Sequence, residues 1–433
     1  MGNQIGECSA GAWQATLRSA WWLLVATALG GCTTYYHGRG IQYQIKPQYG
    51  VDDPQFFRSM GHLLGPPLIG GNRITGLLNG DQIFPAMLEA IRGAQESINL
   101  ETYIYWSGHV GEQFGDALVE RARAGVRVHV ILDWVGARKL DSKVITMMDE
   151  AGVEVRRHNP LVWYNPARIN HRDHRKLLIV DGRIGFTGGA GIADLWLGNA
   201  DSPEHWRDSH FRLEGPAVAQ MQAVFMDNWT KTTARVLDGE SYFPELKSVG
   251  NDFAQVFKSS PREGTENVRL MYMLSIAAAR KSIRLSVPYF VPGHLITSAL
   301  VEARKRGVKV EIIVPGARTD SPLVRHASRS KWGALLKADV TIYEYEPTMY
   351  HCKVMIVDDL WVSVGSANID SRSFRLNDEA NLNVFAAAFA AEQTAAFEED
   401  KKHARLVTLE SWKNRSLGTR IMELLTSPFH PHL

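Results

Sequence analysis

The sequence contains one short pattern twice, as HRKLLIVDG at residues 174–182 and as HCKVMIVDD at residues 351–359. Two matches of this kind at corresponding places exceed what chance supplies, so the pattern marks an internal repeat. Its polar positions are His174, Lys176 and Asp181 in the first copy and His351, Lys353 and Asp358 in the second. The four consecutive apolar residues between Lys and Asp in each copy predict a strand buried on both faces.

The repeat extends well beyond this pattern. The stretch ALVERARAGVRVHVILD at 117–133 matches ALVEARKRGVKVEIIVP at 299–315, and AQESINLETYIY at 94–105 matches ARKSIRLSVPYF at 279–290. Each copy predicts a short strand, a helix that ends at a glycine, and a β-branched strand. We therefore predict an α/β fold of two pseudo-symmetric halves, each with a mixed, mostly parallel sheet flanked by helices.

The boundaries of the halves follow from the repeat and from composition. The first half is expected over residues 72–229, and the second half, with a C-terminal helix after Phe385, over residues 267–433. Residues 230–266 are polar and end in SSPREGTEN, a composition that predicts a linker region.

Residues 1–31 have the composition of a signal peptide. Arg18 precedes an apolar run of about 11 residues and small residues before Cys32, and this run is too short to span a membrane as a helix. LGGC at 29–32 resembles the bacterial lipoprotein signal, in which the cysteine becomes the lipidated N-terminus. We predict a lipidated Cys32 and a mature protein anchored to a membrane of the bacterial cell envelope, facing the periplasm. An uncleaved hydrophobic anchor or a mis-assigned start codon is the alternative.

The overall composition is that of a folded soluble protein, with 45% hydrophobic and 22% charged residues among 433 and a net charge of +2. A protein that binds nucleic acid mainly through phosphate contacts would more often carry a strong basic excess, so the charge disfavours that class. Two of the three cysteines, Cys8 and Cys32, lie in the N-terminal segment, and no disulfide framework is expected. Strand alternation turns Cys352 away from its neighbours, which predicts a buried, inert thiol.

The segments that follow each pattern point to a family. GGAGIADLW begins at Gly188 and GSANIDSRSF begins at Gly365, each shortly after the Asp of its copy. With the paired patterns, they resemble the phospholipase D superfamily. ETYIYW, WRDSHFRLEGPAV and GSANIDSRSFRLNDEANL are similar to stretches of the bacterial cardiolipin synthases, and the resemblance runs from about Asn72 to the closing LLTSPF. It implies two phospholipase D-like halves with the active site between them.

The residues themselves agree with this chemistry. Substitution at a phosphodiester needs a nucleophile, an acid that protonates the leaving oxygen, and positively charged groups beside the anionic non-bridging oxygens. Two histidines and two lysines supply this set, with Ser366 and Asn368 as further groups for the phosphate. Because imidazoles titrate near neutral pH, one ring can serve as base and the other as acid. No metal or other cofactor is then required.

The resemblance assigns further roles. It implies that Asp208 and Glu379 orient the two histidines, that His174 is the nucleophile and that His351 is the acid and base, although the symmetry of the repeat permits the reverse order. Asp181 and Asp358 belong to the catalytic pattern, but aspartates at strand ends are more often structural and pair with nearby basic groups.

The first copy departs from the family pattern. It has Gly188, Gly189, Ala190 and Gly191 where an Asn is usual at the last position, so an amide donor is missing at Gly191. Either backbone N–H groups of this loop, such as that of Gly189, hold the phosphate, or this half of the site is weakened.

The leading hypothesis is a phosphatidyltransferase of the cardiolipin synthase type that acts on membrane phospholipids such as phosphatidylglycerol, as a monomer and without nucleic acid. Phospholipase D hydrolysis, a nucleic-acid phosphodiesterase and an inactive envelope scaffold are the alternatives. His171, His205 and His210 flank the first pattern, but isolated histidines are more often surface or hydrogen-bonded residues than catalytic ones, and they lack the spacing of a zinc site. RHASRSKW at 325–332 is either a solvated helix face or a rim that attracts anionic headgroups.

Overall fold

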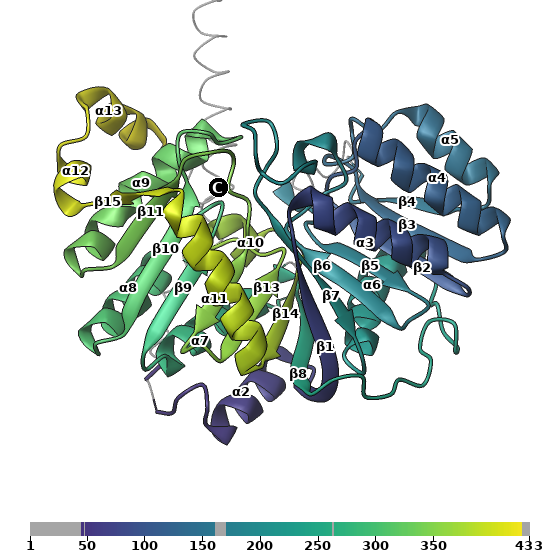
Figure 1. Cartoon of the computed structure of the whole chain (residues 1–433), viewed down its shortest axis with the longest axis horizontal. Coiled ribbons are helices and arrows are strands. Elements are labelled where there is room, and N and C mark those ends of the chain that lie inside the picture. The colour runs from purple at the N-terminus through teal and green to yellow at the C-terminus, as the bar shows by residue number, and fades with distance from the viewer. Residues whose placement is uncertain (1–44, 47, 161–169, 262–263, 427–433) are drawn as a thin grey trace, which may run out of the picture. The chain divides into compact units, whose positions relative to one another are not determined.

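A single mixed sheet of fifteen strands runs through the part of the chain that the computed structural model describes, which is residues 45–46, 48–160, 170–261 and 264–426 (Figure 1). The strand order is β15–β11–β10–β9–β12–β13–β14–β8–β1–β7–β6–β5–β2–β3–β4. These residues belong to one compact unit, 45–433. The predicted signal peptide and Cys32 lie outside the described residues.

The first part of the chain forms one side of this sheet. Its elements are α2 (Pro54–Leu64), β1 (Ile69–Leu78), α3 (Asn79–Gly93), β2 (Ser97–Thr102), α4 (His109–Arg123), β3 (Arg127–Asp133), α5 (Ser142–Glu150), β4 (Glu154–His158), β5 (Lys176–Val180), β6 (Ile184–Gly188), the 3-10 helix η3 (Asp194–Trp196), β7 (Ser209–Glu214) and α6 (Val218–Thr233).

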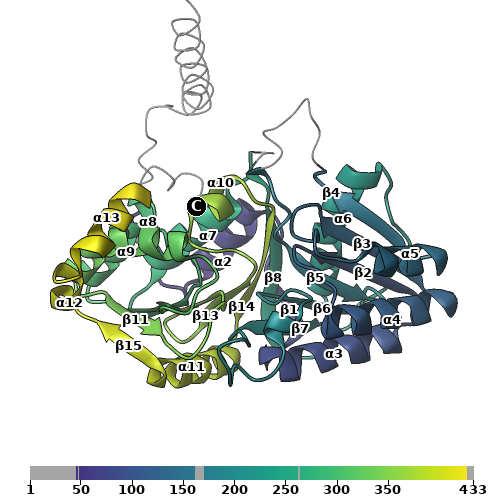
Figure 2. The same cartoon turned by 90° about the horizontal axis from the view of Figure 1, so that it is seen from above.

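The second part forms the other side. Its elements are β8 (Asp252–Ser259), α7 (Asn267–Ala278), β9 (Ser282–Ser286), α8 (His294–Lys305), β10 (Lys309–Pro315), α9 (Pro322–Lys337), β11 (Thr341–Tyr345), β12 (Val354–Val357), β13 (Trp361–Gly365), α10 (Ser371–Arg375), β14 (Glu379–Phe385), α11 (Ala387–Lys402), β15 (Ala404–Val407), α12 (Leu409–Lys413) and α13 (Leu417–Thr426). Helices cover both faces of the sheet, with α3 and α11 on one face and α6 and α7 on the other (Figure 2).

The two predicted halves are present, but their sheets are joined and are not mostly parallel. Four neighbouring pairs are parallel, β2–β3, β3–β4, β9–β10 and β10–β11. The other ten are antiparallel. The physical reason lies in the connections. Short turns join β5 to β6 and β12 to β13, and a short turn can join only antiparallel strands, whereas helical crossovers serve the outer strands.

The segment expected to be a linker, 230–266, contains a strand. Its residues Asp252–Ser259 form β8, which pairs antiparallel with β14 on one side and with β1 on the other. This strand closes the sheet between the halves. The C-terminal helix expected after Phe385 is α11, whose Phe389, Ala390 and Phe397 are buried.

One hydrophobic cluster crosses the boundary between the halves. It packs Phe211 and Trp229 of the first half with Tyr350 and Val364 of the second. Separate clusters lie under the outer helices of each half. The position of the two patterns relative to each other is therefore fixed by shared core packing. Among the described residues, no helix combines the length and apolar character that crossing a membrane requires.

Candidate active site

The two histidines of the repeated pattern meet where the halves join. His174 lies two residues before β5, and His351 lies three residues before β12. The backbone ties each one to the other half, because His174 N–H donates to the carbonyl of Asp378 at 2.9 Å and His351 N–H donates to the carbonyl of Arg207 at 2.7 Å. Both rings are buried. The site is thus formed by both halves together, as the family resemblance implies.

Each imidazole is oriented by a carboxylate of the opposite half. The Nδ1 of His174, in the first half, lies 3.1 and 3.0 Å from the two carboxylate oxygens of Glu379, in the second. The Nδ1 of His351 lies 2.7 Å from Oδ2 of Asp208, in the first half. Because a carboxylate only accepts hydrogen bonds, Nδ1 carries the proton in both rings and Nε2 is the atom left for chemistry, although Nζ of Lys353 lies 3.2 Å from Nε2 of His351.

The two lysines stand beside the rings. Lys176 Nζ donates to the carbonyl of His174 at 2.8 Å, and Lys353 Nζ donates to the carbonyl of His351 at 2.8 Å. Both side chains are buried, and their ammonium groups repel each other. Burial, and then the charge of Lys353, lowers the pKa of Lys176 to about 7. Burial also lowers the pKa of Lys353. An anion placed between the two ammonium groups would relieve both effects.

The electrostatics of the rings favour neutral imidazoles in the free protein. Burial lowers the pKa of His174 to about 4, although the Glu379 carboxylate opposes this shift. Burial, and then the charge of Lys353, lowers the pKa of His351. Burial by itself would raise the pKa values of Glu379 and Asp208, but their histidine partners outweigh it and both are lowered. Both carboxylates are therefore anionic, as ring orientation requires.

A network of donors holds the Glu379 carboxylate. Besides His174, it accepts from Ser366 Oγ, from Ser373 Oγ at 2.7 Å and from Asn377 Nδ2 at 3.4 Å. Ser366, which the sequence predicts as a phosphate ligand, therefore donates its hydroxyl proton to Glu379. In this structure Ser366 is a positioning residue. Asn368 is buried nearby, and its Oδ1, an acceptor, has no hydrogen-bond partner within the described residues, whereas its amide Nδ2 is the atom that can donate to a phosphate oxygen.

A different set holds the Asp208 carboxylate. It accepts from Trp196 Nε1 at 2.8 Å and from the backbone N–H of Ser209 at 2.8 Å. Trp196 follows His174 by 22 residues, and Ser373 follows His351 by the same number. The repeat thus uses one position for a donor to a carboxylate, an indole in one half and a hydroxyl in the other. Sequence reasoning missed both residues, although the repeat spacing could have found them.

Comparison with known proteins agrees with this arrangement. A sequence family described as "Cardiolipin synthase, PLD-like domain" matches residues 87–225 and 272–401, one stretch in each half. The chain belongs to this family. The family and the enzyme class predicted from the paired patterns, a phosphatidyltransferase of the phospholipase D superfamily, are confirmed.

Curated cardiolipin synthases are similar over most of their length. Cardiolipin synthase 1 of Bacillus cereus is 35% identical over 358 residues, which are 80% of this chain and 70% of that one. The major cardiolipin synthase of Bacillus subtilis is 36% identical over 366 residues, or 84% and 76% of the two chains. The crystal structure of phosphatidylserine synthase from Haemophilus influenzae matches with a TM-score of 0.67 at 13% identity, covering 87% of this chain and 97% of that one, and supports the fold alone.

In this cardiolipin synthase family member, the glycine loop of the first half does not hold phosphate through Gly189. Its N–H donates to the carbonyl of Ser209 at 3.1 Å, and a Cβ at this position would lie 2.1 Å from Oδ1 of Asp208. The glycine is needed because the carboxylate sits against the backbone. At Gly191 a Cβ would lie 2.9 Å from Cβ of Ile104 and 3.1 Å from the ring of Trp196. The ring of Trp196 therefore lies where the side chain of an Asn at residue 191 would begin.

Asp181 and Asp358 lie away from the reacting groups, at the opposite ends of the motif strands from the histidines. Asp181 accepts from the backbone N–H groups of residues 95–97, and Asp358 accepts from those of residues 280–282. Their inclusion among the catalytic residues is corrected by this geometry, and so is the expected pairing with basic side chains. Each carboxylate fixes the turn that precedes β2 or β9.

Aromatic rings surround the two histidines. The ring of Tyr103 lies 5.3 Å from that of His174, and the rings of Trp206 and Tyr289 lie 5.2 and 6.1 Å from that of His351. In the structure they form walls of the site, and Tyr289 also donates its hydroxyl to Asp320.

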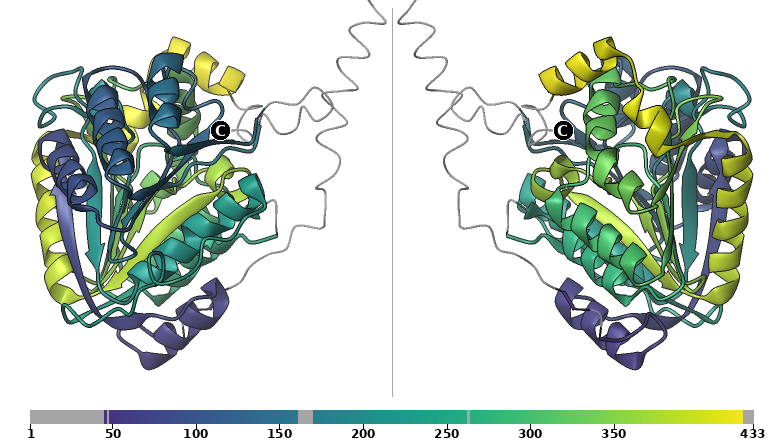
Figure 3. Two further views of the ribbon diagram at one scale, coloured as in Figure 1. Left: turned by 90° about the vertical axis from the view of Figure 1, so that its right-hand side faces the viewer. Right: turned by 90° about the vertical axis from the view of Figure 1, so that its left-hand side faces the viewer.

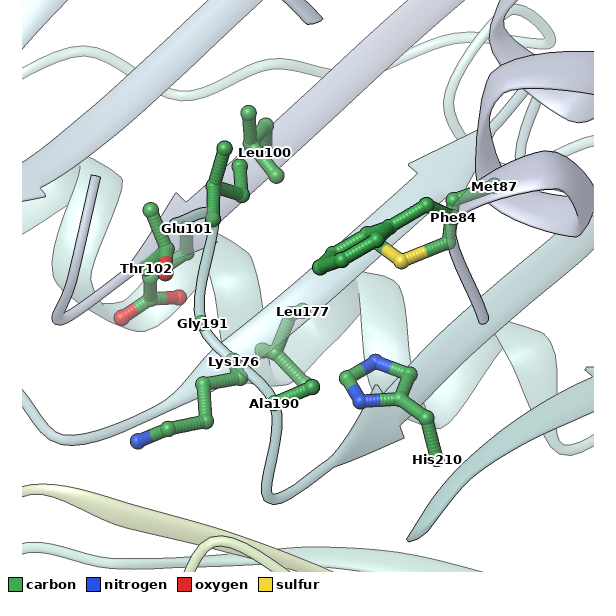
Figure 4. Close-up of a pocket in the computed structure, with 11 residues that line it drawn as sticks. Phe84, Met87, Leu100, Glu101, Thr102, Lys176, Leu177, Ala190, Gly191 and His210 are labelled. Carbon is green, nitrogen blue, oxygen red and sulfur yellow. The ribbon is translucent and has the colours of Figure 1, made fainter. Parts of the chain in front are cut away.

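The other histidines and the cysteine considered in the sequence analysis lie outside the set of residues that surround the reacting atoms. His171 contacts the carbonyl of Leu376, and His205 lies near Asp201 on the surface. Cys352 is buried, and burial raises the pKa of its thiol to about 12, in keeping with an inert residue. His210 lies beside a small cavity next to Gly191 and the stem of Lys176 (Figure 4). Neither ring nitrogen of His210 has a partner among the described residues.

Proposed function

We propose that the protein transfers a phosphatidyl group in two steps through a covalent intermediate on His174. The observation that carries this proposal is the pair of buried histidines, each with Nδ1 bonded to a carboxylate of the other half. With a pKa of about 4, the His174 ring is neutral at physiological pH and its Nε2 lone pair can attack phosphorus.

The first step exchanges one bond at phosphorus. A bond forms between His174 Nε2 and phosphorus while the bond from phosphorus to the leaving alkoxide breaks. His351 Nε2 delivers a proton to that oxygen, so a neutral alcohol leaves. The negative charge of the bound phosphodiester favours the protonated form of His351 for this role, since it offsets the nearby lysine charge.

The second step reverses these roles with a new alcohol. His351, now neutral, removes the proton of the acceptor hydroxyl as its oxygen attacks phosphorus, and the bond between phosphorus and His174 breaks. Lys176, Lys353 and Asn368 hold the non-bridging oxygens in both steps. No step uses a metal ion.

Membership of the cardiolipin synthase family implies membrane phospholipids as substrates and association with a membrane. We take phosphatidylglycerol as donor and a second phosphatidylglycerol as acceptor, with cardiolipin and glycerol as products. Water would compete as acceptor and give phosphatidic acid, but burial of both rings limits its access.

The cellular setting rests on the sequence. We propose a lipoprotein of the bacterial cell envelope that begins at Cys32 and faces the periplasm, acts as a monomer and does not bind nucleic acid, in line with its net charge of +2. Intact-mass measurement of the membrane-extracted protein tests the anchor. An unmodified chain that starts at Met1 would overturn it.

The reaction is tested with purified full-length protein and phosphatidylglycerol vesicles, followed by mass spectrometry of the products. Cardiolipin and glycerol are expected, with a rate that a chelator leaves unchanged. Phosphatidic acid as the main product would make the protein a phospholipase D. Cleavage of DNA with inert lipids would overturn the substrate class, and a folded protein without any product would support the scaffold alternative.

The order of the histidines is tested with substrate labelled in the phosphatidyl group. An acid-labile phosphohistidine is expected on the peptide that contains HRK, and His174→Ala should abolish it. Label on His351 that survives in His174→Ala would reverse the two roles.

A further inference from the structure

Helix α13 presents its apolar side chains to the outside. Five large hydrophobic residues of this ten-residue helix are exposed, with Leu417 at 72% and Leu424 at 73% as the extreme cases. The full set is Leu417, Ile421, Met422, Leu424 and Leu425. On a helical wheel these positions form one continuous side, so they make a patch and not scattered contacts.

The inner side of the same helix is polar. Glu423 and Thr426 are its buried residues, and Glu423 is bonded to Arg415 Nε at 2.8 and 2.9 Å. A surface helix of a soluble protein has the opposite arrangement, with apolar residues toward the core. The orientation of α13 is therefore fixed by an ion pair, and its apolar side needs another partner.

Basic side chains lie on α13 itself and on the neighbouring elements. Helix α9, which packs against α13, carries four Arg or Lys residues and no Asp or Glu. Arg325 and Arg329 pair with Glu344, at 2.7 and 2.5 Å, and because this one carboxylate also pairs with Arg405 the cluster keeps a positive charge. The other basic groups of this corner, Lys331, Lys337, Lys413 and Arg420, have no acidic partner within 4.0 Å in the described part of the chain. An apolar strip with basic flanks matches an anionic bilayer surface.

The same charges disfavour a second copy of the chain as the partner. A twofold contact through α13 would bring the basic flanks of both copies together, and like charges at an interface oppose association. A bilayer of anionic phospholipids accepts the apolar side chains and pairs with the basic ones at once.

Helix α9, against which α13 packs, reaches toward the surroundings of the site. The first turn of α9 lines a small pocket with Tyr289, and the Tyr289 ring lies 6.1 Å from that of His351. In Figures 1 and 3, α13 lies at the outer edge of the molecule, beyond α9. We propose that α13, with the basic residues of α9 and with Lys413 and Arg420 beside its apolar side, docks the protein on an anionic phospholipid bilayer by inserting that side among the headgroups.

The docking is tested in the mature chain, residues 32–433 with Cys32 replaced by Ser, so that neither a lipid anchor nor the apolar run of residues 1–31 contributes. Leu424→Cys carries an environment-sensitive dye, and Val236→Cys, an exposed apolar position after α6, is the matched control. The buried Cys352 should not react. With phosphatidylglycerol vesicles the dye at 424 should shift to the blue and the dye at 236 should not. Vesicles of phosphatidylcholine alone should give a smaller shift.

A second variant measures the contribution of the patch. Leu417→Glu with Leu424→Glu should lower vesicle partitioning roughly 10- to 100-fold, because two apolar side chains no longer leave water, while Val236→Glu should not. Turnover of a water-soluble, short-chain phosphatidylglycerol should stay unchanged in both. The water-soluble substrate separates the docking proposal from the proposed reaction. Docking can fail while turnover of this substrate persists, and turnover can fail while docking persists.

Three results would overturn the docking proposal. The dye at 424 could show no blue shift with vesicles although the labelled protein binds them as strongly as the wild type. It could already be blue-shifted without lipid in a monomer, which would mean that the chain covers its own patch. Sedimentation could show a dimer that Leu417→Glu with Leu424→Glu dissociates, which would assign the patch to a second copy.

Discussion

The donors at the equivalent positions 196 and 373 offer a test of whether the two halves do different chemistry. Trp196→Phe removes the indole N–H that bonds Asp208, the carboxylate behind His351. Ser373→Ala removes the hydroxyl that bonds Glu379, the carboxylate behind His174. Each change loosens one carboxylate and leaves both histidines in place, so the two variants report separately on the acid–base role of His351 and on the nucleophilic role of His174.

The expected magnitudes follow from the number of donors. Asp208 has three, from His351, Trp196 and the Ser209 backbone, so the loss of the indole removes a third of its hydrogen bonds. A hydrogen bond to a buried charge contributes about 1.5–3 kcal/mol, and each loss of ~1.4 kcal/mol from the transition state slows a step tenfold, so Trp196→Phe should slow the His351-dependent step roughly 10- to 100-fold.

The second variant should have a smaller effect. Glu379 has four kinds of donor, and Ser373→Ala leaves those of His174, Ser366 and Asn377. The remaining bonds can tighten around the carboxylate, so we expect a decrease of about 3- to 10-fold in the step that depends on His174.

The assay is single-turnover transfer from two labelled substrates, one with glycerol and one with p-nitrophenol as the leaving group. A good leaving group needs no acid, so Trp196→Phe should form the adduct from the p-nitrophenyl substrate at the wild-type rate and then accumulate it. Ser373→Ala should slow adduct formation from both substrates. Melting temperatures within a few degrees of the wild type serve as the control for folding.

The reasoning is refuted by either of two results. If Trp196→Phe slows adduct formation equally for both leaving groups while Ser373→Ala slows only adduct breakdown, the halves have the opposite roles. If both variants behave alike, the two histidines are not specialised, and the assignment built on the asymmetry of the site has to be abandoned.

Three further predictions concern charge and stability. His210→Leu should become more stable than the wild type as pH falls, because burial lowers the pKa of His210 in the folded protein to about 4 from an ordinary 6.5, so that protons favour the unfolded chain. At pH 5 the gain in the free energy of unfolding, measured with denaturant, should be about 2 kcal/mol. A difference between variant and wild type that is the same at pH 7.5 and pH 5 would contradict this. Phosphate binding at pH 8 should take up protons, because Lys176 has a pKa of about 7 in the free protein and the anion raises it; titration calorimetry in buffers of different ionisation enthalpy should detect this, and Lys176→Met should take up fewer protons, leaving the share of His351. Asp181→Ala should lower unfolding free energy by about 2 kcal/mol while turnover of the folded protein stays within about threefold, and a large loss of turnover with unchanged stability would restore Asp181 to the catalytic set.

The sequence was sufficient for the repeat, the class of fold and the four basic residues of the site, because these depend on local pattern and spacing. It could not place β8, since a strand inside a polar, Pro- and Gly-containing segment owes its structure to the neighbouring strands β1 and β14. The excess of antiparallel pairs also escaped notice, although the short connections after each motif strand could have revealed it.

The residues of the site, like the fold, could be predicted from the sequence only in part. Asp208 and Glu379 were found, but the assignment of each carboxylate to the histidine of the other half depends on how the halves pack, and no spacing within one copy encodes that. The sequence predicts Ser366 and Gly189 as phosphate ligands because of their place in the loop. The structure shows that their surroundings, a carboxylate in both cases, decide what they do.

The crossing of partners between the halves means that neither half is a smaller version of the enzyme. A half that kept its own histidine and lysine would hold a ring with no carboxylate behind it, together with a carboxylate that orients nothing. The repeat therefore built one catalytic centre out of two copies and did not build two. A break in the chain between α6 and β8 would leave activity intact only as long as both fragments stayed joined along β1 and β8, and their separation would disable both histidines in the same event.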